Sequence, residues 1–122
     1  MKPIQLRKNT IDIPFINVDG TEAFTLHFEK TDENIKRIQN TEKELKILAK
    51  EIEGKEEADL EDAKGFLKKT IDSILGDGSF QQLYDANPFV ATVTVYFYQI
   101  ALGIKEELEK EDLQAAESKY LK

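Results

Sequence analysis

Few side chains in this chain of 122 residues could perform covalent chemistry. The sequence has no cysteine, which excludes a thiolate zinc site and a cysteine nucleophile. His27 is the only histidine, and a catalytic or metal-binding histidine needs partners that folding brings to it. It alternates with Thr25 and Glu29 along a predicted strand. We therefore interpret His27 as a solvent-facing residue.

Two further segments invite a chemical interpretation, and neither matches a known motif. The acidic run Glu56-Glu57, Asp59, Glu61-Asp62 lacks the order of Asp, Gly and terminal Glu that defines a calcium-binding EF-hand loop. Gly76-Asp77-Gly78-Ser79 lacks the Gly-Lys-Ser/Thr ending of a phosphate-binding loop. The first pattern is typical of a solvated helix face, and the second of a turn followed by a helix cap. We predict no catalytic residue, no metal site, no cofactor and no enzymatic activity.

Charge and the first residues restrict the class of partner and the location. The net charge of −7 argues against nucleic acid, whose binders carry basic patches, and only short pairs such as Lys68-Lys69 occur here. The opening stretch MKPIQLRKNT lacks the apolar core of a signal peptide. A small domain without disulfides suits the reducing cytosol. We expect a cytoplasmic protein that binds other proteins rather than nucleic acid or membrane.

The first 30 residues predict a β-hairpin. Ile11 to Val18 forms an extended apolar stretch, and Phe24, Leu26 and Phe28 alternate with polar residues. Asp19-Gly20 between them favours a tight turn of type I′. Pro14 predicts that the first strand lies at a sheet edge or breaks there.

Three helix starts follow. Thr31 or Asp32 can cap a helix whose apolar positions extend to Ile52, with a weak point at Asn40-Thr41. A second helix is predicted from about residue 58 to residue 75, ended by Gly76 in the left-handed conformation. Ser79 and Gln82 match a capping box, which predicts a short helix over residues 80–84.

The last predicted helix contains the most informative segment. Asn87-Pro88 matches a helix start with Asn as N-cap and Pro in the first turn. Residues 89–104, FVATVTVYFYQIALGI, contain no charged residue. The β-branched residues also fit a strand, but length and spacing favour a helix that continues into the charged end of the chain. The run is too short and too polar, with Thr92, Thr94 and Gln99, to favour a membrane span.

This charge-free segment has two interpretations that the sequence leaves open. One is a central helix surrounded by the others. The other is a helix with more apolar surface than a small domain can cover, because Val90, Val95, Tyr98 and Leu102 lie off its main apolar stripe. Uncovered apolar surface would indicate an interface. The main stripe consists of Phe89, Val93, Phe97, Ile100, Ile104 and Leu108.

Together these elements predict one domain, residues 1–122, of the α+β class and mainly α. A hairpin over residues 1–30 would pack on a bundle of three to four helices over residues 31–110. A charged helical tail would follow over residues 111–122.

Residues 66–88, FLKKTIDSILGDGSFQQLYDANP, resemble the small tail assembly chaperones of long-tailed phages and prophages of Gram-positive bacteria. The order of elements is similar over nearly the whole chain, and the specific similarity covers about residues 66–97. The matching positions are Phe66, Ile71-Asp72, Ile74-Leu75-Gly76, Gly78, Leu83-Tyr84 and Pro88.

The resemblance implies a partner and a mode of action. Such chaperones coat the tape measure protein, a long helical chain, and keep it in solution during tail assembly; many also self-associate. It implies that this chain is a non-enzymatic phage or prophage protein of the host cytoplasm, acting on the tape measure protein or another tail protein, as a possible homo-oligomer. The side chains we expect to contact the partner are Tyr84, Phe89, Val93, Tyr96, Phe97 and Ile100. The alternative is a small acidic regulatory adaptor or inhibitor that acts by protein–protein binding.

Overall fold

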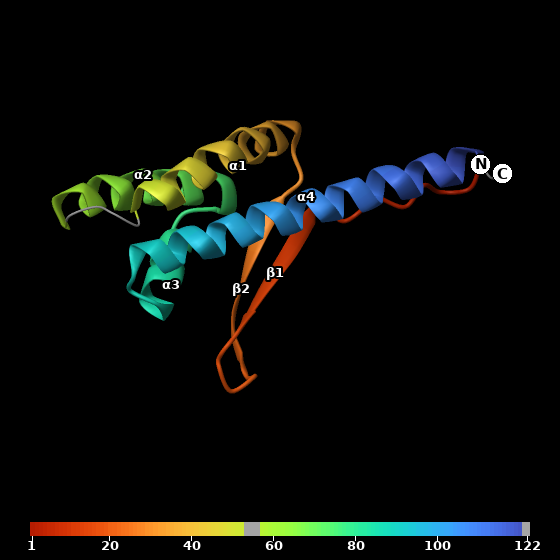
Figure 1. The fold of residues 1–122 in the computed structure, drawn as a ribbon. Helices are drawn as coiled ribbons and strands as arrows, with labels where there is room; N and C mark the ends of the chain where they lie inside the picture. Colours follow the sequence, from red (N-terminus) through yellow and green to blue (C-terminus); the bar gives the residue numbers. More distant parts are fainter. Residues whose placement is uncertain (53–56, 121–122) are drawn as a thin grey trace.

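The computed structural model describes residues 1–52 and 57–120, and it contains a two-stranded antiparallel hairpin followed by four helices (Figure 1). The predicted class, α+β and mainly α, is confirmed. The elements are β1 (Thr10–Ile16), β2 (Glu22–Glu29), α1 (Asp32–Ile52), α2 (Glu57–Leu75), α3 (Ser79–Ala86) and α4 (Val90–Tyr120).

The hairpin is present, but its turn is not of type I′. Only Gly20 has a positive φ, at 89°, whereas Asp19 does not. The Gly20 amide donates to the Asn17 carbonyl at 2.9 Å, and Asn17 pairs with Thr21 across the loop. This is a three-residue loop, in which an ordinary turn is followed by a left-handed glycine. The Asp19 side chain stabilises this loop, because its carboxylate accepts hydrogen bonds from the Thr21 amide and hydroxyl.

Pro14 does not break β1, which runs continuously from Thr10 to Ile16 opposite β2. The Lys30 amide donates to the Asn9 carbonyl, so hydrogen-bonded pairs alternate from that end of the ladder. Pro14 pairs with Thr25 at a position that this alternation leaves without ladder bonds. The missing N–H therefore costs the sheet nothing.

Thr31 caps α1, as one of the two predicted alternatives. Its hydroxyl accepts from the Asn34 amide at 3.1 Å, and its carbonyl accepts from the Ile35 amide. The helix does not stop at the predicted weak point, where Thr41 is buried and its hydroxyl donates to the Arg37 carbonyl one turn earlier.

The start of α3 differs from the prediction. Gly78 occupies the N-cap position in the left-handed conformation and makes no side-chain cap, so the predicted Ser79–Gln82 capping box is wrong. The Ser79 hydroxyl donates to the Leu75 carbonyl instead. The cap comes from α2, where the Asp72 carboxylate accepts from the Phe80 amide at 3.0 Å. Gly76 does end α2 with a positive φ of 104°, as predicted.

The predicted start of the last helix is also wrong by two to three residues. Asn87 is the C-cap of α3, and its amide donates to the Leu83 carbonyl. Its backbone is extended, which is the conformation that a following proline favours. Phe89 takes the N-cap position of α4 because its carbonyl accepts from the Val93 amide. The helix then continues to Tyr120, so the predicted tail over residues 111–122 begins inside α4 rather than as a separate element.

One core joins all six elements, and α4 runs along its length (Figure 1). Phe28 of β2, Leu45 of α1 and Leu67 of α2 are fully buried in it, as are Leu83 of α3 and Phe97 of α4. An ion pair between Lys30 and Glu111, 2.6 Å apart, connects the end of the hairpin to the far part of α4. The α4 helix therefore contacts the other elements from its first turn to about residue 111.

Candidate protein-binding surface

Three of the six predicted contact residues lie in the core. Val93 and Phe97 are fully buried, and Ile100 is 6% exposed. They face the other elements because spacings of three and four residues place them on one side of α4. In this structure Val93 and Phe97 offer no surface to a partner, and the interpretation of the main stripe as core is the one that fits.

The other three predicted residues are accessible to different degrees. Phe89, ahead of the first turn of α4, is 61% exposed. Tyr96 is half-buried, with its ring edge-on to Phe15 of β1 at 6.2 Å between centroids. Tyr84 is also half-buried, because it stacks on Phe80 at 5.6 Å and carries the Lys64 ammonium 4.2 Å above its ring. Of these three, Phe89 has the most surface free for a partner.

A second apolar row lies on α4 beside its main stripe, and two of its residues, Ala91 and Tyr98, also pack on the edge of the core. Ala91, Val95, Tyr98 and Leu102 follow each other at spacings of four, three and four residues, which places them on one helix face. Val95 is 48% exposed, and the other three are half-buried. We call these four residues the outer stripe. Val95, Tyr98 and Leu102 are three of the four residues that the sequence had placed off the main stripe, whereas the fourth, Val90, is buried.

An apolar groove lies on another side of α4, where β1 packs beside it. Tyr96, Gln99 and Gly103 contribute from the helix, and Ile11 and Phe15 from the strand. Its volume is about 250 Å³, several times the share of one water molecule in the liquid. The outer stripe and this groove flank the solvent side of α4, so this helix offers apolar surface over more than its packed face.

Another apolar patch is found between α1 and α2. Ile47 is 61% exposed and Phe66 is 41% exposed, with the half-buried Leu48 between them. Nothing in the sequence analysis had selected Ile47. Its exposure results from the place where α1 and α2 meet, which helical spacing alone does not reveal.

The polar side chains offer little that could perform catalysis. His27 lies on the solvent face as predicted, where its Nδ1 is 2.8 Å from Asp12 Oδ1. Lys8 donates to the other oxygen of Asp12 at 2.6 Å. These two hydrogen bonds, that of Lys8 first, lower the pKa of Asp12 below its ordinary value of 3.8. Because the cluster is open to solvent, it is a surface network rather than a pocket for substrate.

Within residues 1–52 and 57–120, no three His, Asp or Glu side chains lie close enough to hold a metal ion. Part of the acidic run considered above lies outside the described residues, because Glu56 is not placed and the side chains of Glu57 and Asp59 are not described. No helix in the described part of the chain is long and apolar enough to cross a membrane.

Comparisons with protein-family models, with curated proteins and with solved structures find no match to this chain. The assignment of the candidate surface therefore rests on the arrangement and exposure of its residues in this structure.

Proposed function

We propose that this protein binds another protein without catalysis and covers an apolar helical segment of it. The observation that supports this proposal is the outer stripe of α4, whose central residue Val95 is 48% exposed. Apolar side chains arranged along one helix face form a ridge that packs against a second helix. Phe89, 61% exposed ahead of the first turn of α4, is a further accessible apolar side chain.

The charge of the molecule fits a role in keeping a partner in solution. The outer stripe ends at Leu102, and the next two turns of the helix carry Glu106, Glu107 and Glu109. Lys105 and Lys110 lie on the same turns, so three carboxylates and two ammonium groups would stand beyond the end of a partner helix laid on the stripe. The net charge of −7 would keep the resulting complexes apart by mutual repulsion.

The resemblance described above suggests who the partner is. We propose that it is the tape measure protein of a phage or prophage tail and that this chain is its assembly chaperone in the host cytoplasm. Support comes from the order of elements, from the segment over residues 66–88, and from a solvent-facing apolar helix in an otherwise highly charged chain.

The test is co-expression with the tape measure protein. The proposal predicts that the wild type moves this partner into the soluble fraction. Val95→Glu should abolish the effect because it places a charge in the centre of the outer stripe. Gln82→Glu, an equal charge change at an exposed position of α3, should retain it. Unchanged partner solubility with the wild type would refute the proposal.

A further inference from the structure

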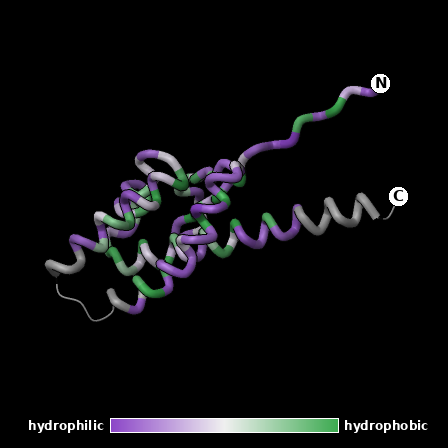
Figure 2. The backbone as a smooth tube through the Cα atoms, turned by 90° about the horizontal axis from the view of Figure 1, so that it is seen from above, coloured by the Kyte–Doolittle hydropathy of each residue, from purple (hydrophilic) through white to green (hydrophobic). Residues whose placement is uncertain are grey.

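An N-terminal arm, residues 1–9, precedes β1 and belongs to neither strand. Figures 1 and 2 show it leaving the body, and in Figure 2 it diverges from α4. Its apolar side chains are not covered by the rest of the chain. Ile4 is 78% exposed and Leu6 is 90% exposed. Two large apolar residues exposed this fully, on one short segment, indicate a segment that packs on something else.

The arm also differs from the rest of the chain in charge. Lys2, Arg7 and Lys8 are its charged side chains, and no acidic residue precedes Asp12. The arm therefore carries +3, and because the whole chain carries −7, the remainder carries −10. In an extended backbone, alternate residues share a face, so Ile4 and Leu6 point the same way with Lys2 beside them. The arm is complementary to an apolar surface with acidic edges.

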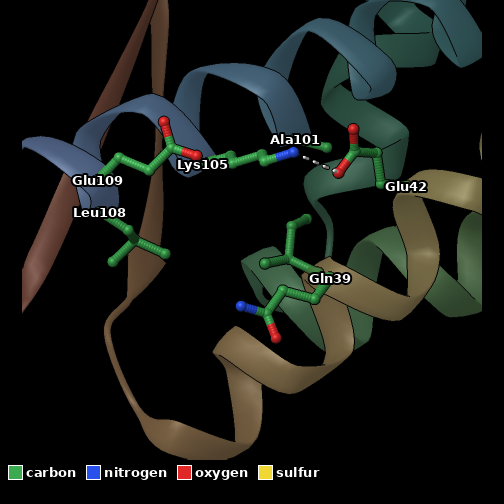
Figure 3. Close-up of a pocket in the computed structure, with 7 residues that line it drawn as sticks. Gln39, Glu42, Ala101, Lys105, Leu108 and Glu109 are labelled. Carbon is green, nitrogen blue, oxygen red and sulfur yellow. Dashed lines mark ion pairs between the residues drawn. The ribbon is translucent and has the colours of Figure 1, made fainter.

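Such a surface exists between α1 and α4 (Figure 3). The groove has a volume of about 310 Å³. Ile38, Ala101 and Leu108 supply its apolar lining, Ile38 and Ala101 as nearly fully buried side chains, and the polar lining comes from Gln39, Glu42, Lys105 and Glu109. Lys105 reaches across to Glu42 with an N–O distance of 3.8 Å, and its side chain is 55% exposed. Because this ion pair is long and exposed, replacing Lys105 by another cation beside Glu42 should cost little free energy.

We propose that the arm of one copy docks in the α1–α4 groove of a second copy. Ile4 and Leu6 pack on the apolar lining, and Lys2 reaches the carboxylate of Glu42 or Glu109. The lengths agree: Ala101 to Glu109 spans about 12 Å of helix, and Lys2 to Leu6 spans about 13 Å of extended chain. This contact goes beyond the proposed function, because it involves no partner other than the chain itself.

The first test is the concentration dependence of mass in solution for the full chain. The wild type should exceed the monomer mass of 14.0 kDa as its concentration rises, by sedimentation or light scattering. Ile4→Ser combined with Leu6→Ser should weaken self-association at least about tenfold. Gln5→Ser, on the opposite face of the arm, should leave it unchanged. A wild type that stays monomeric, or oligomers that the double variant does not weaken, would overturn the proposal.

The second test locates the contact, and it uses the natural absence of cysteine. Leu6→Cys and Gln39→Cys, prepared as separate variants and mixed, should form a disulfide between chains because the docked arm brings these positions together. A disulfide needs Cα atoms within about 7 Å. Gln82→Cys, exposed on α3 at the other end of α4, is the matched control and should react much less (Figure 1). Equal reaction of both pairs, or none of either, would overturn the assignment.

Discussion

At the scale of single residues, several polar side chains of this protein complete the ends and turns of its elements. Asp72 caps the next helix, Thr31 caps its own, and Asp19 closes the hairpin loop. Asp12 links the two strands through His27. Each satisfies backbone or side-chain groups that would otherwise lack a partner. Substitutions at these positions should therefore change stability or local titration.

Asp72→Ala removes the acceptor for the Phe80 amide and should lower the free energy of unfolding by about 1 kcal/mol. The loss follows because Phe80 is buried and its amide would be left without that partner. Urea denaturation measures the difference. Asp62→Ala, at an exposed position of the same helix, is the control and should change stability by less than about 0.5 kcal/mol. Equal effects would show that Asp72 is not a cap.

The carboxyl of Asp12 should titrate below its ordinary value of 3.8, since hydrogen bonds from Lys8 and His27 favour the charged form. Because the folded pKa is the lower one, its stabilising contribution is complete above the unfolded pKa. It is lost as pH falls through the folded pKa. An NMR titration of Asp12 measures the value, and replacing Lys8 with Met should raise it toward normal. An unchanged pKa in Lys8→Met would contradict this network.

At the scale of elements, the backbone conformation at a turn determines which residue types each position can hold without strain. Gly76 ends α2 with a φ of 104°, a conformation that costs other L-residues about 1–2 kcal/mol. Gly65, within the same helix, has ordinary helical geometry and open space where a Cβ would stand. Gly65 within α2 and Gly76 directly after it are therefore a matched pair with opposite expectations.

Gly76→Ala should destabilise the protein by about 1–2 kcal/mol, whereas Gly65→Ala should stabilise it by roughly 0.5–1 kcal/mol. The first change strains the turn into α3, and the second removes the entropy cost of glycine in a helix. Thermal unfolding of both variants measures the contrast. A Gly76→Ala protein as stable as Gly65→Ala would contradict the left-handed turn.

Local signals predicted the elements well and their ends less well. The alternation of Phe24, Leu26 and Phe28 and the cap at Thr31 act within a few residues, so the sequence contains the information. The Asn87-Pro88 pattern predicted that Asn87 would be the N-cap of the last helix. In the structure Asn87 is the C-cap of α3 instead, and it does not also cap α4. The Ser79–Gln82 prediction failed because Asp72, eight residues before Phe80, supplies the bond instead.

At the scale of the whole molecule, helical spacing separated two apolar faces of α4 but could not predict how much of the second face the other elements cover. Phe97 and Val95 are both apolar and two residues apart, yet one is fully buried and the other is 48% exposed. The difference depends on where α1, α2 and the hairpin lie. Two apolar rows on one helix indicate that one was needed for the core, and the outer stripe is the one left over.

The central claim is that this outer stripe binds an apolar helix of another protein. The most direct measurement is the affinity of the purified protein for the proposed partner, the tape measure protein, by titration at low and at high salt. The account predicts an affinity that salt changes little, because apolar contact carries it, and that Val95→Glu reduces by about tenfold or more. An affinity that falls steeply with salt and is unchanged by Val95→Glu would contradict the account. That result would instead favour an acidic adaptor that acts through its surface charge.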